Sequence, residues 1–598
     1  MPPQAAQLAL NALQAGNLAG AQTILARALR ETPNDADILH LTGILYRRQG
    51  RTQEALALFE RALAAAGDRP DIRNNLGITL ASLGQLDKAE QCYREALKLD
   101  PNFPDAAYNL GLLLIERTKW PEARVALEQA LTIRPEHARA LDALGIVLRE
   151  LSDNQAALIA ATKAVALTPT SPSALHNLAQ TYLALGRYEE AIPTYEKALA
   201  LIPNSDATWI GLGHAHRALG SPEKAKTAYQ NAVNINPGNP DAHRLLNEIV
   251  WQSGATALYL QSFPEALRQR PTDHRLRLAY ANELLKINQH EAAGGELKLA
   301  LNAAKNDADV LDAVARARAM AGDFKEASAF HGRALEAAPG NAMFVRNFAE
   351  TLLKAKEHTA AHSVTSRGLE RFPLEQGVLA LHTTAQRLAG DPGHARLADY
   401  EHLPTVIEVE PPAGFPDIET FCIKLNDVLD RLHATKAHPT DQTLRGGTQT
   451  FGALFLNPDP TIQLLSTQLR KAIAGFIATL PEDHGHPFNA RKRTNFDFSG
   501  SWSVKLRSGG FHTNHFHPKG WISSAFYVQM PPVAAGSNEA WFKMGETNLE
   551  LGDREIIARL VEPKVGRLVL FPSYFWHGTV AFSSPSPRTT VAFDVVPN

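Results

Sequence analysis

The sequence predicts a multidomain protein, in which an all-α superhelical solenoid is followed by a β-rich domain with flanking helices. Three observations lead to this prediction: a repeat of 34 residues, the loss of that repeat near residue 400, and a series of short β-type segments in the last hundred residues. A chain of 598 residues is also too long to fold around one hydrophobic core.

The repeat is clearest in its glycines and prolines. Gly43, Gly77, Gly111 and Gly145 are each 34 residues apart. A parallel series of prolines has the same spacing: Pro101, Pro135, Pro169, Pro203, Pro237 and Pro271. A small residue allows two helices to approach closely, and a proline ends the helix that precedes it. The spacing therefore predicts stacked pairs of helices.

The residues between these markers resemble the tetratricopeptide repeat, a helix–turn–helix unit of 34 residues. The third unit, for example, has Gly77, Ala89, Tyr93, Ala96 and Pro101. The match is specific over residues 36–239 and weakens over 240–273, where Asn247 and Tyr259 take positions that are normally small. It then recovers to about residue 375, which gives about eleven repeats and a helical remnant to about residue 400.

Each unit of such an array contacts only its neighbours, so the array forms a superhelix with a long concave face. The resemblance implies that this face binds a protein or peptide, or supports self-association. The alternative is that the solenoid only spaces or solubilises the second domain. The sequence does not identify the bound segment.

The composition argues against several other classes of partner. The chain has 60 basic and 62 acidic residues and no dense basic run, so nucleic acid is not expected. No run of 18 apolar residues and no leader-like N-terminus occur, so neither a membrane span nor a signal peptide is expected. The two cysteines, Cys92 and Cys422, lie in different predicted domains. A reducing, cytoplasmic location is therefore expected.

The helical repeat ends near residues 390–393, and residues 406–412 have the character of a linker or an edge strand. We therefore expect a solenoid at 1–400, a linker at 401–415 and a second domain at 416–598. Residues 417–435 and 459–480 are predicted helices. The predicted strands are Ser501–Arg507, Trp521–Met530, Ala540–Lys543, Arg567–Phe571 and Thr589–Val595. Many short strands indicate a β-sandwich or a jelly-roll barrel.

Histidines are concentrated in this second domain. His512, His515 and His517 lie within six residues, and His577 follows about sixty residues later. Two ligands at i and i+2 can chelate a metal where a strand ends in a turn, and Pro518 indicates such an end. A third ligand from a distant strand would leave the opposite positions of the metal open.

These segments resemble the 2-oxoglutarate/iron(II) dioxygenase superfamily, whose fold is the double-stranded β-helix, or jelly roll. They are more narrowly similar to a bacterial and phage family with an H-x-H-P element. The corresponding segments here are His515–Pro518, Ser523–Pro531, Phe571–His577, Arg588–Phe593 and the upstream Arg445–Phe451. The resemblance covers roughly residues 415–598.

The resemblance implies that Fe(II) binds to His515, His517 and His577, and that the cosubstrate 2-oxoglutarate pairs with Arg588 and Thr590. Arginine suits this role because its planar fork matches a carboxylate. One departure is that His517 stands where the superfamily has an acidic ligand, and three histidines also suit zinc. Five further residues are secondary candidates. His512 is a candidate hydrogen-bond donor to a metal ligand or a replacement for one of the paired ligands. Tyr527 and Trp521 are candidate pocket residues, although aromatic residues here are more typical of the barrel core or rim. Asp497 and Asp594 are carboxylates without the ligand spacing.

The sequence thus favours an oxidative hydroxylase that acts on a protein or peptide recruited by the solenoid. One alternative is a scaffold protein with a degenerate, catalytically inactive barrel. Another is a zinc hydrolase, which would need a general base, and the candidates Glu539 and Glu546 are distant in sequence from the histidines. The substrate and the oligomeric state are not specified by the sequence.

Overall fold

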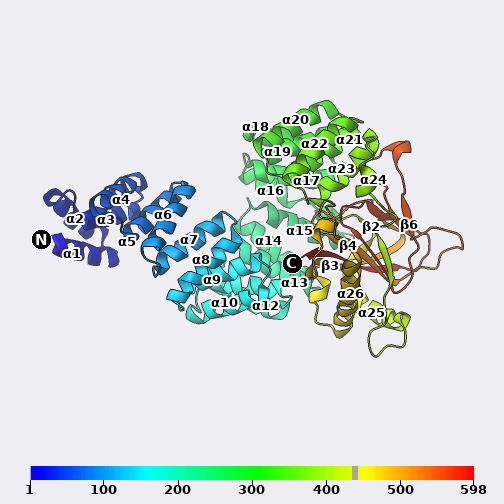
Figure 1. The fold of residues 1–598 in the computed structure, drawn as a ribbon, viewed down its shortest axis with the longest axis horizontal. Helices are drawn as coiled ribbons and strands as arrows, with labels where there is room; N and C mark the ends of the chain where they lie inside the picture. The colour runs from blue at the N-terminus through cyan, green and yellow to red at the C-terminus, as the bar shows by residue number, and fades with distance from the viewer. Residues whose placement is uncertain (1, 434, 436–441, 598) are drawn as a thin grey trace. The chain divides into compact units, whose positions relative to one another are not determined.

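The computed structural model describes residues 2–433, 435 and 442–597. The chain forms two compact units, Met1–Pro203 and Asn204–Asn598. The first unit contains helices only, and the second contains further helix pairs and the whole β domain (Figure 1). The predicted fold class, a helical-repeat solenoid followed by an antiparallel, jelly-roll-like region, is confirmed. The predicted limits of 1–400, 401–415 and 416–598 stay a prediction.

The first unit is a stack of six antiparallel helix pairs. Its helices are α1 (Pro2–Gln14), α2 (Leu18–Glu31), α3 (Ala36–Arg48), α4 (Thr52–Ala66), α5 (Pro70–Ser82), α6 (Leu86–Leu99), α7 (Pro104–Glu116), α8 (Trp120–Ile133), α9 (Ala138–Glu150), α10 (Asn154–Leu167), α11 (Pro172–Ala184) and α12 (Tyr188–Leu201).

The repeated glycine is explained by the residue that faces it in the second helix of each pair. A Cβ atom on Gly77 would lie 2.6 Å from the Tyr93 ring, because that ring packs directly on the α5 backbone. At Gly145 the facing residue is Ala161, and an added Cβ would meet no atom closer than 3.6 Å. The facing side chain therefore leaves no room for a Cβ atom at Gly77, whereas it does leave room for one at Gly145.

The second unit continues the helical array. Its helices in this region are α13 (Asp206–Ala218), α14 (Pro222–Ile235), α15 (Pro240–Gln252), α16 (Ser262–Gln269), α17 (His274–Lys286), α18 (His290–Ala303), α19 (Ala308–Met320), α20 (Phe324–Ala337), α21 (Ala342–Lys354), α22 (His358–Arg371), α23 (Gln376–Ala389) and α24 (His394–Leu397).

The pair formed by α15 and α16 departs from the others, as its sequence does. A 3₁₀ turn at Thr256–Leu258 and the eight-residue α16 replace the usual long second helix. Asn247 fixes this bent segment, since its amide accepts from the Leu260 backbone N–H and donates to the Ser262 hydroxyl at 2.9 Å. The Tyr259 hydroxyl donates to Glu283 at 2.8 Å. The bend borders a cavity of about 660 Å³ that Arg445 of the β domain also lines.

The β domain contains two antiparallel sheets. The larger sheet has the order β1-β7-β4-β9-β3-β2, and the smaller has the order β6-β5-β8. Their strands are β1 (Thr405–Glu408), β2 (Leu444–Gln449), β3 (Phe496–His512), β4 (Ile522–Gln529), β5 (Phe542–Met544), β6 (Arg559–Val561), β7 (Arg567–Pro572), β8 (His577–Thr579) and β9 (Arg588–Pro597).

The flanking elements differ in how well the sequence predicted them. Helices α25 (Ile418–Leu432) and α26 (Pro460–Thr479) lie where helices were expected. Strand β1 lies in the predicted linker and pairs with β7 at the sheet edge. Strands β2, β6 and β8 were not predicted, because short strands depend on pairing with distant segments more than on local sequence.

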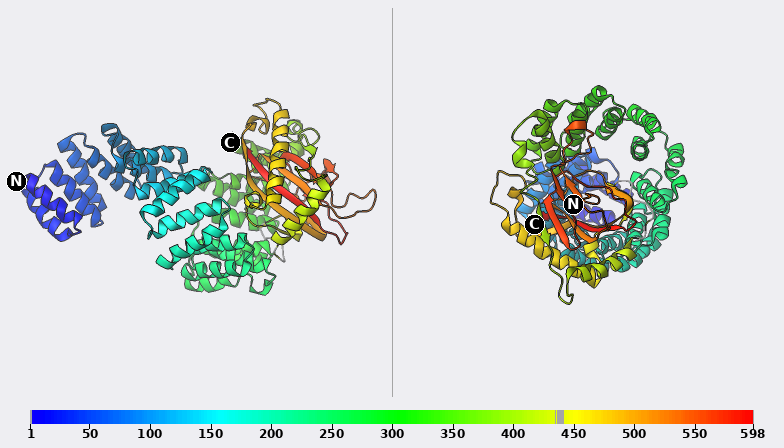
Figure 2. Two further views of the ribbon diagram at one scale, coloured as in Figure 1. Left: turned by 90° about the horizontal axis from the view of Figure 1, so that it is seen from below. Right: turned by 90° about the vertical axis from the view of Figure 1, so that its right-hand side faces the viewer.

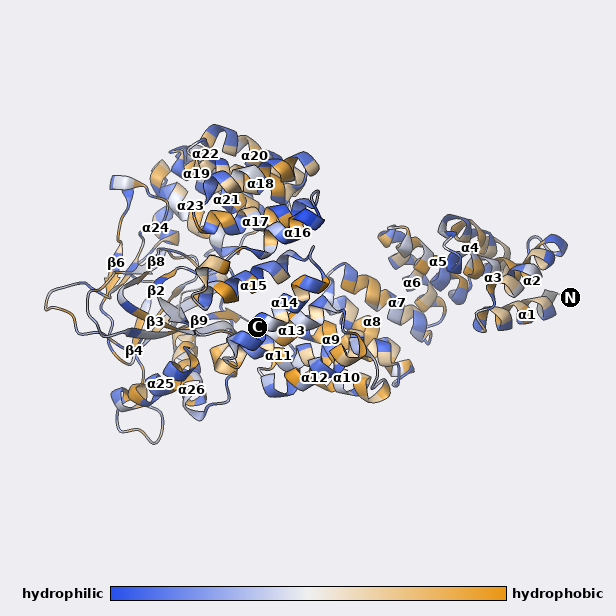
Figure 3. Ribbon diagram, turned by 180° about the vertical axis from the view of Figure 1, so that it is seen from behind, coloured by the Kyte–Doolittle hydropathy of each residue, from blue (hydrophilic) through white to orange (hydrophobic). Residues whose placement is uncertain are grey.

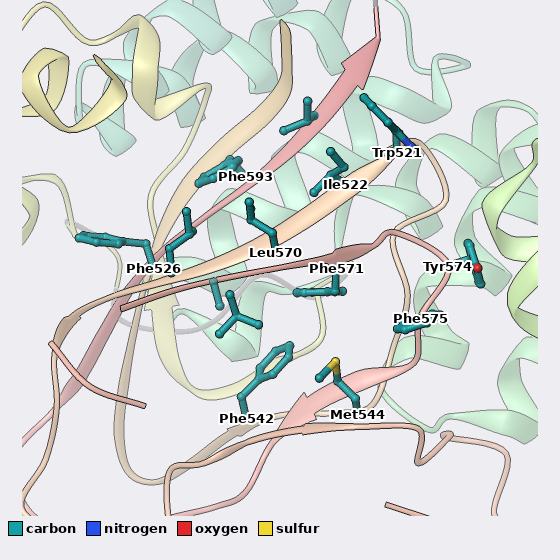
Figure 4. Close-up of a cluster of buried hydrophobic side chains, with 14 of the residues drawn as sticks. Trp521, Ile522, Phe526, Phe542, Met544, Leu570, Phe571, Tyr574, Phe575 and Phe593 are labelled. Carbon is teal, nitrogen blue, oxygen red and sulfur yellow. The ribbon is translucent and has the colours of Figure 1, made fainter. Parts of the chain in front are cut away.

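One hydrophobic core joins the end of the solenoid to the β domain. It includes Leu353 and Leu379 from the helices and Phe571 and Phe593 from the large sheet. Figure 4 shows the sheet side of this core, where Phe571 faces Phe542 and Met544 of the small sheet. The Phe542 and Phe571 ring centroids are 5.2 Å apart. Figures 1 and 2 show the last solenoid helices beside the strands of the same unit.

Polar and apolar residues alternate along the helices, as Figure 3 shows. This two-sided pattern is typical of helices that bury one face against a neighbour. Within the described part of the chain, no helix combines the length and apolar character needed to cross a membrane.

We predict that Gly77→Ala weakens the pair α5–α6 by about 1–3 kcal/mol, because the new Cβ must displace the Tyr93 ring. Hydrogen exchange of peptides from α5 and α6 measures this local stability. Gly145→Ala is the matched control, and it should be neutral or stabilising by up to about 1 kcal/mol, since it removes the helix penalty of glycine without a clash. Equal effects of the two substitutions would contradict this account.

Candidate metal centre

Two segments that are far apart in sequence meet at the histidines. His515 and His517 follow the end of β3, and His577 begins β8. The backbone N–H of His515 donates to the carbonyl of His577 at 2.9 Å, and the reverse bond has the same length. The His517 N–H donates to the Ser573 carbonyl at 2.8 Å. This pairing fixes the three side chains at one end of the barrel.

The three imidazoles present one nitrogen each to a common point. Their ligand atoms all lie within 4.8 Å of one another. In each ring Nδ1 is engaged elsewhere: His515 Nδ1 lies 2.8 Å from the Thr513 carbonyl, and His577 Nδ1 lies 2.9 Å from the Phe575 carbonyl. His517 Nδ1 lies 2.6 Å from Asp594 Oδ1. Since these acceptors place the proton on Nδ1, each Nε2 keeps a lone pair for a metal ion.

Burial keeps these rings in the form that binds metals. It lowers the pKa of His515 to about 3, with a smaller contribution from the neighbouring His517. Burial likewise holds the pKa of His577 well below its ordinary value, and the nearby His515 lowers it further. Because a histidine must be deprotonated to bind a metal, both ligands are available at neutral pH without a proton being displaced.

Strand β9 supplies the opposite wall of the same cavity. Alternate residues of a strand point to one face, so Arg588, Thr590, Ala592 and Asp594 share a side. The first three line the cavity, and Asp594 contacts His517. The arginine and the metal-ligand cluster therefore face one enclosed space. The complete lining is Trp502, Val504, His512, His515, His517, Ser524, Ala525, Phe542, His577, Gly578, Thr579, Arg588, Thr590 and Ala592.

Arg588 is a buried cation without a carboxylate partner among the described residues, and only 2% of it is exposed. Its guanidinium lies 5.2 Å from the Tyr527 ring centroid. In the described part of the chain, neither Arg588 Nε nor the Tyr527 hydroxyl has a hydrogen-bond partner. Burial lowers the pKa of Arg588. Unpaired buried donors of this kind are costly, and an anionic ligand would satisfy them.

The other predicted pocket residues differ in their positions. His512 lines the cavity, with its ring centroid 5.9 Å from that of His515, and its Nδ1 is 3.3 Å from the Thr443 hydroxyl. The Tyr527 ring lies beside the Arg588 guanidinium and does not line the cavity. Trp521 does not reach the cavity, because its indole N–H donates to the Phe488 carbonyl at 2.8 Å inside the core.

The two carboxylates considered as ligands lie in different surroundings. Asp497 lies on the surface beside Arg470, at 3.2 Å. Asp594 holds His517, and it also accepts a hydrogen bond from Ser523 at 2.6 Å. Its supporting role was not anticipated from the sequence, although its even spacing from Arg588 along the strand is a signal that places both on one face.

No carboxylate is among the described residues that line the cavity. Glu539 accepts hydrogen bonds from Ser583, and Glu546 is paired with Lys543 and bonded to Asn514. Neither lines the cavity as a general base would. The chemistry of the donor set, three imidazoles with an unpaired buried arginine, instead fits a metal ion together with a small carboxylate ligand.

Comparisons with known families agree with this arrangement. Residues 500–594 match the family described as "Putative 2OG-Fe(II) oxygenase". Residues 143–206 and 183–249 match tetratricopeptide repeat families, and residues 6–166 match the middle TPR-like domain of cilia and flagella-associated protein 70. Matches to tetratricopeptide repeats thus precede a match to a 2OG-Fe(II) oxygenase family along the chain. Among curated proteins, no match is found.

Solved structures similar to the chain are repeat proteins. YrrB, described as a TPR protein with an unusual peptide-binding site, is 24% identical over 31% of this chain and 95% of its own, with a TM-score of 0.28. A tetratricopeptide repeat protein from Parabacteroides merdae is 21% identical over 41% and 97%, with a TM-score of 0.33. PilF of Pseudomonas aeruginosa is 20% identical over 35% and 94%, with a TM-score of 0.32.

We predict that Asp594→Ala weakens divalent metal binding by about ten- to a hundredfold, because the His517 ring loses the acceptor that orients it. Isothermal titration with Co(II) measures the affinity. Asp594→Asn keeps an acceptor oxygen, so its Co(II) affinity should lie between those of the native chain and Asp594→Ala. Asp497→Ala removes an exposed carboxylate from the neighbouring strand and should bind as the native chain does. An unchanged affinity in Asp594→Ala would rule out this supporting role.

Proposed function

We propose that the protein is a 2-oxoglutarate- and Fe(II)-dependent oxygenase that hydroxylates a protein or peptide. The observation that carries the proposal is the shared cavity, which has a three-histidine cluster on one side and the buried, unpaired Arg588 on the other. A dicarboxylate cosubstrate needs both features, since one end must reach the metal and the other must meet a fixed cation.

In this proposal the residues divide the work as follows. His515, His517 and His577 hold Fe(II) through Nε2, and Asp594 keeps the His517 ring oriented. Arg588 pairs with the distal carboxylate of 2-oxoglutarate, and the hydroxyl of Thr590, which lines the same cavity, donates to that carboxylate as well. When bound, the iron and cosubstrate supply the oxidation, in which dioxygen converts 2-oxoglutarate to succinate and carbon dioxide and the second oxygen atom hydroxylates the substrate.

Enclosure of the cavity supports this use. Trp502 and Phe542 line the cavity beside the histidines, and their apolar surfaces exclude bulk water from the reacting groups. Iron is favoured over a hydrolytic zinc ion because the described lining contains no carboxylate to serve as general base, and because hydrolysis has no use for a buried arginine.

A peptide substrate is supported by the repeats that surround the irregular pair α15–α16. Aromatic residues Trp251, Tyr259 and Tyr280 line the cavity there, together with Arg445. Arg445 lies two residues after Thr443, whose hydroxyl contacts His512 in the metal cavity. A chain segment bound at this cavity would lie near the mouth of the site. Both cysteines are buried and unpaired, which suits the proposed cytoplasmic location.

We predict that the native chain, purified without oxygen and supplied with Fe(II), 2-oxoglutarate and dioxygen, produces succinate. His577→Ala should abolish succinate formation because the metal loses a ligand. Arg588→Ala should raise the KM for 2-oxoglutarate by at least about thirtyfold, which corresponds to a loss of about 2 kcal/mol for a buried charge pair. Mass spectrometry of succinate measures both effects.

Arg507→Ala is the matched control for the arginine, since Arg507 lies on the neighbouring strand with its side chain exposed. It should leave the KM unchanged. Absence of both succinate and metal-bound 2-oxoglutarate from the native chain would favour the scaffold alternative. Bound zinc without turnover of 2-oxoglutarate would favour the hydrolase.

A further inference from the structure

The segments that carry the histidines each present an aromatic residue away from the metal cavity. Phe516 lies between His515 and His517, and Trp576 immediately precedes His577. Their rings meet edge to face, with centroids 4.8 Å apart and planes at 83°. Trp576 is only 3% exposed, so this pair is a buried contact rather than a surface feature.

This aromatic pair packs against helix α23, which follows the last repeat. The Trp576 indole N–H lies 3.1 Å from the Thr384 hydroxyl oxygen and 3.4 Å from the Ala380 carbonyl. One helical turn earlier, a Cβ atom on Gly377 would clash with Arg346 Cδ of α21 and would lie 2.9 Å from the Phe516 ring. The absence of a side chain at position 377 therefore lets both the Arg346 side chain and the Phe516 ring pack against the helix.

Helix α23 itself is held on all sides. Residues 376–386 are buried without interruption. Its first turn is capped by the Glu375 carboxylate, which accepts from the Val378 N–H at 2.6 Å. The Thr365 hydroxyl of α22 meets the His382 ring at 3.0 Å. The helix is thus fixed to the solenoid on one side and to the histidine segments on the other.

Within the β domain, these segments are held by the short pairing of β8 with β5 and by backbone hydrogen bonds of His515 and His517. Strand β8 has three residues, and His515 pairs with His577 through an isolated bridge rather than a continuous ladder. A short bridge constrains the rotation of the segments less than a long strand does. The two aromatic contacts with α23 supply a second point of attachment for each segment.

We propose that Thr384 and Gly377 of helix α23 are positioning residues for the metal centre, so that the end of the solenoid sets the geometry of the three histidines. This inference rests on the metal-binding role proposed above. In this proposal, α23 is the helix that connects the end of the solenoid to the histidine segments. A displacement of α23 would move Trp576 and Phe516, and with them the residues on either side.

The first test replaces the hydroxyl that meets Trp576. Thr384→Val keeps the shape and leaves the indole N–H with only the distant Ala380 carbonyl. We expect Co(II) affinity to fall about tenfold, the lower end of the effect of contacts that support a ligand, and the visible spectrum of bound Co(II) to change. Thr384→Ser restores the hydroxyl and should restore both.

Thr351→Val is the matched control. Thr351 is a buried threonine of α21 whose hydroxyl meets the His331 ring at 3.0 Å, and it does not contact the histidine segments. It should lower the thermal unfolding midpoint of the chain as Thr384→Val does, while Co(II) affinity and spectrum stay native. A purely structural role for Thr384 predicts the same native metal binding in both variants.

The second test adds a methyl group at the contact with Phe516. Gly377→Ala should displace the Phe516 ring, as well as the flexible Arg346 side chain of α21, and weaken Co(II) binding, whereas Gly77→Ala makes a comparable clash with Tyr93 in the first unit and should not. If the native chain binds no Co(II), the proposed metal centre itself fails. If the native chain binds and the α23 variants bind equally well with native spectra, this inference alone is overturned.

Discussion

The alternation of side chains along β9 is the constraint on which the site and the core both depend. This strand lies between β4 and β3 in the large sheet. One face carries Arg588 and Thr590 toward the cavity, and the other places Val591 and Phe593 in the core. A shift of one residue in register would exchange the two faces, burying the arginine in hydrocarbon and exposing the core. The same pairing that stabilises the sheet therefore selects the residues of the site.

The site concentrates groups that are unfavourable to bury unless they are partnered. Each histidine satisfies Nδ1 within the protein and leaves Nε2 for a ligand from outside. Arg588 Nε has no hydrogen-bond partner in the described structure. Unfulfilled polar groups of this kind reduce the stability of the fold, and natural proteins keep them chiefly at functional sites. Binding of a metal ion and an anion would satisfy these groups and so stabilise the fold.

The sequence predicted the solenoid well because each repeat depends on contacts between neighbours, and the spacing of Gly77 and Tyr93 records such a contact directly. It also predicted which histidines meet, since a close pair and one distant histidine fit a recognisable pattern. It left Trp521 open between the core and the pocket, and the structure buries this residue in the core, where its indole N–H donates to the Phe488 carbonyl. It could not show the role of Asp594 or the contact of Trp576 with α23, because these depend on packing between remote segments.

The continuous core between the last repeats and the sheets has a consequence for how such a protein is divided. The family match begins at residue 500, yet the support for His577 includes Thr384. A fragment cut at the start of the matched region would expose Trp576 and Phe516 to solvent and lose one side of their packing. Recombination that exchanged the repeats would have to keep α23 together with the β domain. A boundary at which the repeats could be exchanged therefore lies within the helical array, before α23.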